Sequence, residues 1–224
     1  MKVLVACEES QRVCVAFRAK GHEAYSCDII PCSGNYPEWH IMQDVLPLLD
    51  GDCEFMTMDG KKHKIHGKWD MVIAFPPCTF MSAAGACRMY PTKGNIDIER
   101  FNRSQDAKNF FMAFYNANCD KIIIENPKPL KVVGLPKESQ RIQPWEYAQD
   151  ESEFFTKQTY LWEKGVNLLI PLRTNKPAET MPFVNAGSKK ANGEYRDKQG
   201  CKFGALERSK TFWGVALAMA NQWG

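Results

Sequence analysis

The sequence lacks any apolar run close to the roughly 18 residues that a membrane-spanning helix needs. It begins MKVLVACEESQ, with acids where a secretory signal peptide would continue its apolar stretch. It also lacks an excess of either charge, because its formal net charge is only +3. With 44% hydrophobic residues, it does not have the composition of a disordered chain, a collagen or a coiled coil. These absences predict one globular domain of 224 residues in the cytoplasm, with no membrane partner.

Closely spaced cysteine pairs are missing as well, since none of the nine cysteines belongs to a CxxC motif. In a reducing compartment most of them should be free thiols that pack as small apolar residues. Residue types that bind zinc do fall within one third of the chain, namely Cys27, Cys32, Cys53, His63 and His66. Structural zinc sites, however, usually show paired short spacings. We therefore expect no metal, and we ask whether one cysteine differs from the others.

The N-terminal part of the chain has the pattern of a strand, a helix and a second strand. Residues 3–7 form a short apolar run, residues 10–20 carry apolar side chains at helical spacing, and residues 24–27 form another apolar run that ends at Asp28. Such a unit predicts a parallel sheet with helices on its faces. Next, two short strands joined at Asp59-Gly60 predict a hairpin on the sheet edge, within about 53–67.

The middle of the chain repeats the alternation of strand and helix. Residues 69–75 predict a strand that must end at the Pro-Pro-Cys sequence of 76–78, because proline cannot continue a central strand. Residues 99–118 have the spacing of an amphipathic helix, and residues 121–124 predict a strand that is followed by Glu125. We therefore predict an α/β fold with a Rossmann-like, doubly wound, mostly parallel sheet and an inserted β-hairpin.

In an open parallel sheet, ligands bind beyond the carboxyl ends of the strands, close to the point where the strand order reverses. The loop at 7–11 (CEESQ) has no glycine, so the GxGxxG fingerprint for pyrophosphate is absent. Its acids, together with Asp28 after the second strand, favour a cofactor with ribose hydroxyls and a positive centre but no phosphate. Asp44-Val45, after a short third strand, could meet an adenine edge. Asp28 and Asp44 could equally be helix caps or solvated loop residues.

Cys78 differs from the other cysteines because a strand end and two prolines hold it at the mouth of this crevice. A thiolate there would be a good nucleophile, provided that loop amides or a cation lower its pKa. Glu125 should face it from the adjacent strand, and a partly desolvated carboxyl group can keep its proton at neutral pH. Together they suit attack on a ring that takes up negative charge. Alternatively, Cys78 is a buried structural thiol and Glu125 an acid at a helix N-terminus.

Two motifs, FPPCTF at 75–80 and IENP at 124–127, resemble the proline-cysteine loop and the Glu-Asn dipeptide of the DNA cytosine-5 methyltransferases. The chain is also similar to short, phage-type members of that family at 142–162 and 208–224. Amino-group methyltransferases have Asp, Asn or Ser before the two prolines, where this chain has Phe75. The resemblance implies the methyltransferase fold, S-adenosylmethionine as cofactor, and DNA as partner in a bacterial or phage-infected host cytoplasm.

The same resemblance implies a role for each motif residue. Cys78 would add to carbon 6 of a cytosine, Glu125 would stabilise the protonated ring nitrogen 3, and carbon 5 would take the methyl group. Lys157 stands where the family has an arginine that helps to hold the base. The cofactor would lie against a larger set of residues: Cys7, Glu8, Glu9, Ser10, Asp28, Ile29, Asp44, Val45 and Pro76.

We divide the chain into a catalytic domain at 1–170, a short basic segment that resembles a target-recognition region at 171–207, and a C-terminal helix at 208–224 that packs back on the catalytic domain. Between residues 171 and 210, nine Lys or Arg outnumber four acids. This segment is either a solvated surface loop or a surface for DNA phosphates. Its expected nucleic-acid contacts are Lys189, Lys190, Arg196, Lys198 and Lys202. Because a duplex hides carbon 6, the cytosine must be flipped out or single-stranded.

Two other functions stay open. The glycine-free first loop and Lys157 also suit a catalytically degenerate relative that binds cofactor or DNA without turnover. The cysteine chemistry also suits a pyrimidine C5-modifying enzyme, such as a hydroxymethylase, that acts on DNA or on a free nucleotide. Loss of the basic segment should spare activity on a free nucleotide but cripple activity on DNA.

Overall fold

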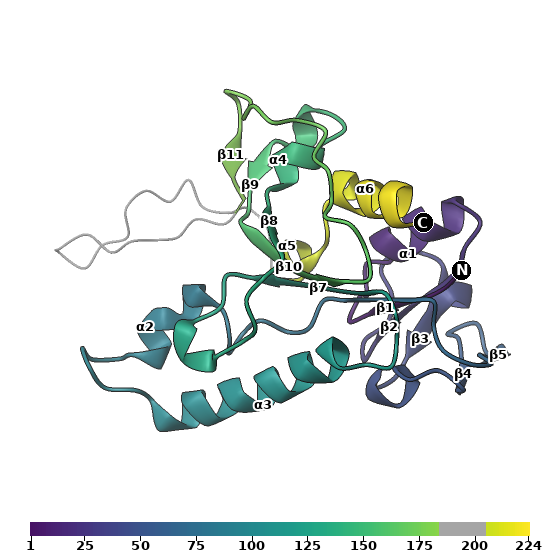
Figure 1. The fold of residues 1–224 in the computed structure, drawn as a ribbon, viewed down its shortest axis with the longest axis horizontal. Coiled ribbons are helices and arrows are strands. Elements are labelled where there is room, and N and C mark those ends of the chain that lie inside the picture. The colour runs from purple at the N-terminus through teal and green to yellow at the C-terminus, as the bar shows by residue number, and fades with distance from the viewer. Residues whose placement is uncertain (184–204) are drawn as a thin grey trace.

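The computed structural model describes residues 1–183 and 205–224, and a seven-stranded sheet lies at its centre (Figure 1). In spatial order the strands are β3 (His40–Met42), β2 (Glu23–Asp28), β1 (Lys2–Ala6), β6 (Met71–Ala74), β7 (Ile122–Pro127), β10 (Thr159–Lys164) and β8 (Gln140–Ile142). The strands from β3 to β7 in this order are parallel, whereas β10 is antiparallel to both β7 and β8. The predicted α/β class with a mostly parallel sheet is therefore confirmed.

Helices cover both faces of the sheet, because neighbouring residues of each buried strand point to opposite sides. The helices α1 (Arg12–Ala19) and α6 (Trp213–Trp223) share a core with Val3 and Val5 of β1. On the other face, α3 (Ile98–Tyr115) shares a core with Leu4 of the same strand. Figure 1 shows α3 below the sheet and α1 and α6 above it. This arrangement is compatible with a Rossmann-like fold.

The predicted hairpin is present and is formed by β4 (Glu54–Met56) and β5 (Lys62–Lys64). Its turn contains Gly60, which adopts a left-handed conformation with φ of 84°. Thr57 forms an antiparallel bridge with Ile41 of β3, so the hairpin lies beside the edge strand of the main sheet. The buried ring of Phe55 stacks on Trp69, which joins the hairpin to the core.

The remaining elements are short. The α-helices are α2 (Ala86–Met89), α4 (Pro144–Tyr147) and α5 (Ala205–Ser209), and β9 (Phe155–Thr156) pairs in parallel with β11 (Met181–Pro182). Single 3₁₀ turns are η1 (Pro37–Trp39), η2 (Leu46–Leu48), η3 (Ala83–Gly85), η4 (Lys131–Val133) and η5 (Glu151–Glu153). Among the helices in the described part of the chain, none is long and apolar enough to cross a membrane.

The described C-terminal residues cover one face of the sheet. The helix α6 begins at Trp213, after α5 has ended at Ser209, and it packs against α1. Its small residue Gly214 allows a close approach, because a Cβ there would lie only 2.2 Å from the carbonyl oxygen of Tyr147. This approach seals the core on that face.

Candidate active site

The strand order reverses between β1 and β6, which are neighbours although the helices that follow them lie on opposite faces. The loops after these strands therefore separate and open a crevice at the carboxyl edge of the sheet. The loops after β2 and β7 reach the same edge, since those strands run parallel to β1 and β6. Candidate residues from four distant parts of the chain thus lie along one edge.

Cys78 and Glu125 lie close enough to interact electrostatically, and Lys157 acts on both. Burial raises the pKa of the Glu125 carboxyl, whereas the Lys157 ammonium and a hydrogen bond with Thr159 lower it. Burial also raises the pKa of the Cys78 thiol, Glu125 raises it further, and Lys157 lowers it. From the sequence, a reactive thiolate required loop amides or a cation to lower the thiol pKa. Lys157 does lower it, but desolvation and the nearby Glu125 carboxyl group outweigh this one cation. The thiol keeps its proton at neutral pH.

Glu125 lies inside β7, whereas the sequence pattern predicted a strand that ends just before it. The antiparallel strand β10 pairs along all of β7, with Leu161 opposite Glu125 and Thr159 opposite Pro127. This pairing extends β7 beyond Ile124. The apolar pattern of residues 121–124 could not predict it, because β10 lies far away in the sequence. Glu125 is therefore held by a rigid strand.

Asn126 ties the two motifs together. Its side-chain Nδ2 donates a hydrogen bond of 2.7 Å to the carbonyl oxygen of Pro76, and the residue is only 1% exposed. The segments that follow are joined by backbone hydrogen bonds as well, from Ala83 to Lys128 and from Leu130 to Met81. Sequence reasoning did not single out Asn126, although its place in the IENP motif was a signal. The loop that carries Cys78 and the strand that carries Glu125 thus form one unit.

Lys157 lies between β9 and β10 and is partly buried. Its ammonium donates a hydrogen bond of 3.1 Å to the carbonyl oxygen of Arg208. This contact holds the cation beside Cys78 and Glu125, and it links the site to the residues that precede α6. Lysine supplies one point charge there, whereas an arginine would supply a planar fork of donors.

Glu8 was expected to contact the cofactor, but its carboxylate binds backbone N–H groups of the protein instead. Its two carboxylate oxygens accept hydrogen bonds from the backbone N–H groups of Val13 at 2.6 Å and Cys14 at 3.2 Å. It therefore caps the first turn of α1. Burial raises the pKa of Glu8 to about 8, although these hydrogen bonds oppose the shift.

Three further acids lie at the ends of β1, β2 and β3. Glu9 is buried, and its Oε1 has no hydrogen-bond partner within the described residues. Asp28 is partly buried, and burial raises its pKa. Asp44 is exposed, and its Oδ1 accepts a hydrogen bond from the backbone N–H of Leu46, the first residue of η2. Burial, Asp28 and Asp44 raise the pKa of Cys7, so these side chains lie near one another.

The other expected cofactor contacts differ in exposure. Ile29 is 76% exposed beside Asp28, whereas Ser10 and Pro76 are buried within their loops. Val45 is 4% exposed and belongs to the hydrophobic core, so the structure gives it a packing role.

A clamp between two loops explains how the first loop folds without glycine. Cys7 and Gln11 adopt left-handed backbone conformations, with φ of 58° and 60°, which ordinary residues rarely adopt. The Gln11 side chain donates to the carbonyl oxygen of Tyr36 at 2.8 Å and accepts from its N–H at 3.1 Å. Gly34 approaches so closely that a Cβ would lie 2.7 Å from the carbonyl oxygen of Ser10. Sequence reasoning missed Gln11 and Gly34 because no local pattern reports contact between loops.

A buried chain of hydrogen bonds among side chains holds the same loops in place. The Nε2 of His40 donates to the carbonyl oxygen of Ile30 at 2.9 Å, and its Nδ1 then accepts from the Ser26 hydroxyl at 2.8 Å. Ser26 also accepts a hydrogen bond of 3.3 Å from Gln11. Burial lowers the pKa of His40, which keeps the imidazole neutral in this chain.

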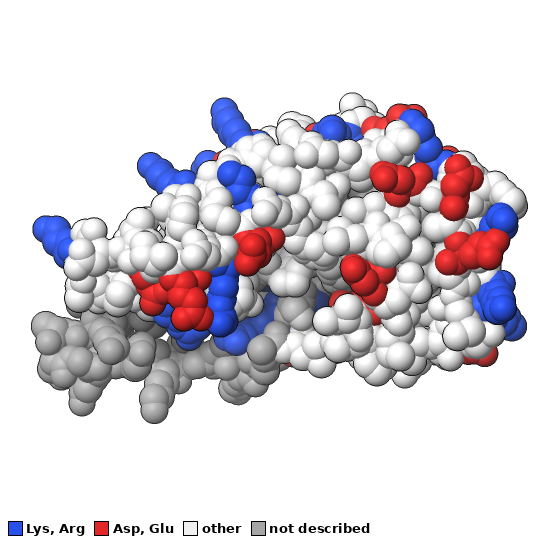
Figure 2. Space-filling view, turned by 90° about the horizontal axis from the view of Figure 1, so that it is seen from below, with Lys and Arg blue, Asp and Glu red and all other residues white. Residues whose placement is uncertain are grey.

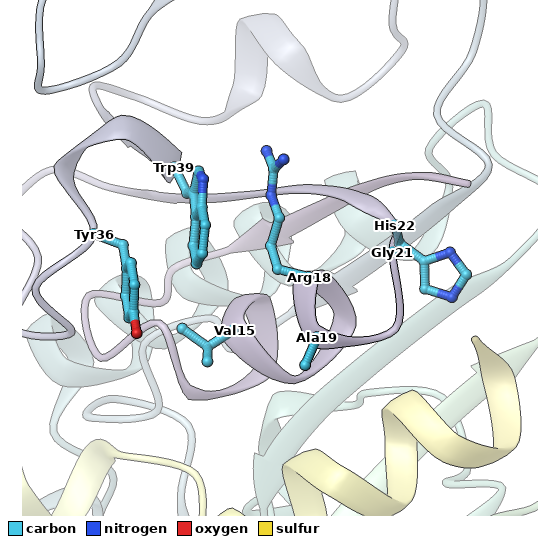
Figure 3. A pocket seen from close by; sticks show the side chains of 7 residues that line it. All are labelled: Val15, Arg18, Ala19, Gly21, His22, Tyr36 and Trp39. Carbon is cyan, nitrogen blue, oxygen red and sulfur yellow. The ribbon is translucent and has the colours of Figure 1, made fainter.

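Another hollow, of about 470 Å³, lies beside α1 at the end of the loop that contains Tyr36 (Figure 3). The rings of Tyr36 and Trp39 stack there with centroids 4.3 Å apart, and the guanidinium of Arg18 lies over Trp39. None of the candidate catalytic or cofactor residues lines it. This hollow is therefore not part of the candidate active site.

The expected nucleic-acid contacts Lys189, Lys190, Arg196, Lys198 and Lys202 lie outside the described residues. Figure 2 shows a hollow on one face of the molecule, with Lys and Arg side chains inside it and Asp and Glu at its border. Within residues 1–183 and 205–224, no three His, Cys, Asp or Glu side chains are grouped so that they could hold a metal ion.

No protein-family model matches the chain, and no curated protein is similar to it.

Proposed function

We propose that this protein is a DNA (cytosine-5) methyltransferase that uses S-adenosylmethionine. The observation that carries the proposal is the hydrogen bond from Asn126 to Pro76, which joins a loop with a nucleophile to a strand with an acid. Cys78 and Glu125 are then neighbours at the point where the strand order reverses. The sheet order, with its antiparallel pair beyond β7, is compatible with the methyltransferase fold that the two motifs imply.

The loops after β1, β2 and β3 fit such a cofactor. Residues 7–11, 28–36 and 43–46 contain acids but no Lys or Arg, so they would repel a phosphate and attract a cation. The unpartnered Oε1 of Glu9 and the carboxylate of Asp28 can accept hydrogen bonds from ribose hydroxyls or face a positive centre. When bound, S-adenosylmethionine supplies an activated methyl group.

The residues of the site perform the remaining chemistry on cytosine. As the Cys78 Sγ bonds to carbon 6, the thiol proton leaves to water, and the Lys157 ammonium stabilises the negative charge on sulfur. Glu125 gives its proton to nitrogen 3, which the raised pKa of its carboxyl favours. After carbon 5 has been methylated, it loses its own proton to water. The bond from Sγ to carbon 6 then breaks with its electron pair on sulfur, the sulfur takes back a proton from water, and nitrogen 3 returns its proton to Glu125.

A covalent trap tests this proposal. The wild-type protein is incubated with S-adenosylmethionine and DNA that contains 5-fluorocytosine, from which the carbon 5 substituent cannot leave as a proton. We expect a denaturation-resistant adduct that Cys78→Ser abolishes and the matched control Cys87→Ser preserves, since Cys87 is an exposed thiol of α2, in the same segment after β6. Nucleoside mass spectrometry on ordinary DNA should then detect 5-methylcytosine.

Other outcomes separate the alternatives. Binding of S-adenosylmethionine without an adduct or 5-methylcytosine would refute catalysis and favour a degenerate binder. A modified free nucleotide, with DNA left unchanged, would favour a pyrimidine C5-modifying enzyme.

A further inference from the structure

Two segments that begin at the candidate catalytic residues contain no acid at all. Residues 76–96 follow β6 and include Cys78, and residues 126–137 follow Glu125. Neither segment has an Asp or Glu, and their charged side chains are all cations. We call this set the basic rim: Arg88, Lys93, Lys128, Lys131 and Lys137.

The two segments lie side by side. The N–H of Ala83 donates to the carbonyl oxygen of Lys128 at 2.8 Å, and the N–H of Leu130 donates to that of Met81 at 2.8 Å. Ser82 and Pro129 form an antiparallel bridge between the same segments. In Figure 1, α2, which contains Arg88, lies near the start of α3 at one end of the molecule. These contacts hold residues 81–83 beside residues 128–130, so that the segment with Lys128 and Lys131 adjoins the loop that carries Cys78.

The cations of the basic rim are available to a partner. All are exposed, and none forms an ion pair with another described residue. Nearby arginines differ in this respect. Arg100 donates to the carbonyl oxygen of Thr79 and lies over the ring of Phe80, while Arg103 pairs with Glu99. These arginines support the loop, whereas the rim cations face solvent.

Charge is thus divided along the carboxyl edge of the sheet. The loops after β1, β2 and β3 carry only acids, and the segments after β6 and β7 begin with only cations. An anionic ligand would be attracted to one side of the site and repelled from the other. Because five exposed cations are spread over two segments, they match a long polyanion better than a single phosphate.

We propose that the basic rim contacts the phosphates that flank the target cytosine in DNA. This inference rests on the proposed function and deepens it, because it assigns the DNA backbone to described residues next to Cys78. It places the DNA strand across the segments after β6 and β7. Contacts of this kind add affinity without sequence information.

The test compares two triple variants with the same change in charge. Lys93→Gln, Lys128→Gln and Lys131→Gln remove part of the basic rim. Lys20→Gln, Lys62→Gln and Lys68→Gln form the control, since Lys20 and Lys68 precede β2 and β6 at the opposite edge and Lys62 lies on the hairpin. Fluorescence anisotropy with a labelled DNA duplex gives the Kd from about 50 to about 200 mM salt.

Each phosphate contact to duplex DNA contributes about 0.9 to the slope of log K against log salt, so the rim variant should lose about 2 to 3 from that slope. The control should keep the wild-type slope. Equal slopes for the two triple variants would overturn the proposal, and so would binding to RNA alone.

The assay separates this inference from the proposed function. Cys78→Ser should bind DNA with the wild-type salt slope, because it changes no charge on the rim. Rim-dependent binding without methyl transfer would refute the methyltransferase and retain the DNA surface. If the protein methylates DNA but the rim variant leaves both kcat/KM and the salt slope unchanged, DNA binding by the basic rim is refuted while the methyltransferase activity is retained.

Discussion

Replacing Gly34 with Ala should force apart the two loops that shape the cofactor side of the site. The new Cβ would lie 2.7 Å from the backbone carbonyl oxygen of Ser10 and 2.6 Å from the Cβ of Gln11. Neither contact can be relieved by rotating the end of a flexible side chain. Overpacking of this kind costs about 1–3 kcal/mol. The two hydrogen bonds between Gln11 and Tyr36 would be stretched in the same movement.

Urea unfolding followed by tryptophan fluorescence measures this cost, and calorimetry measures the affinity for S-adenosylmethionine. We expect Gly34→Ala to lower the free energy of unfolding by about 1–3 kcal/mol. Affinity should fall about tenfold for each 1.4 kcal/mol by which the displaced loop weakens binding. Ser33→Ala is the matched control, since Ser33 is exposed in the same loop. Its backbone N–H still donates to the backbone carbonyl oxygen of Glu9. If both variants unfold at the same urea concentration, the close packing of these loops does not stabilise the fold.

Three further predictions concern buried polar groups. Burial raises the pKa of Glu163 to about 7, and its carboxylate oxygens have no hydrogen-bond partner among the described residues. The protonated Glu163 side chain is therefore favoured in the folded state, and the stability that it contributes is complete below about pH 4.5 and is lost as the pH rises through about 7. When the pH is raised from about 5 to about 8, the free energy of unfolding should therefore fall by about 2 kcal/mol less in Glu163→Gln than in the wild type. Parallel profiles of unfolding free energy against pH for the two proteins would contradict this. Asn126→Ala should cost about 1–3 kcal/mol and slow single-turnover methyl transfer, with little change in cofactor affinity; an unchanged transfer rate would show that the bond to Pro76 does not position the site. Glu8→Ala should lower stability by about 0.5–2 kcal/mol through the lost cap of α1, whereas Glu8→Gln, which keeps an acceptor, should lose less in thermal unfolding.

Much of the parallel sheet could be predicted from the sequence, because its strands are buried on both faces and appear as short apolar runs. The pattern at 69–75 leads to β6, and the Asp59-Gly60 turn leads to the hairpin. The strands β8 and β10 were not predicted. β8 has only three residues, and its place is decided by pairing with β10. The same pairing fixes the true end of β7.

For the site, parallel strand ends were enough to predict that Cys78 and Glu125 would be neighbours. The protonation of Cys78 could not be predicted, since it depends on how far the folded loop excludes water. The roles of Gln11 and Gly34 depend on a contact between separate loops, and a single sequence does not report such contacts. Side chains that bind neighbouring backbone, such as Glu8, can look like ligand contacts when only residue type and position are known.

The packing of α6 on α1 determines the order in which the two faces of the sheet can be covered during synthesis. Arg12 reaches the carbonyl oxygen of Thr211 across a separation of 199 residues, and α6 completes the core above Val3 and Val5. During synthesis on the ribosome, α1 can cover part of that face early, but the part that α6 covers stays open until residues 213–223 have emerged. Folding of the two faces is therefore unequal in time: the side under α3 can close while translation continues, and the side under α6 closes last.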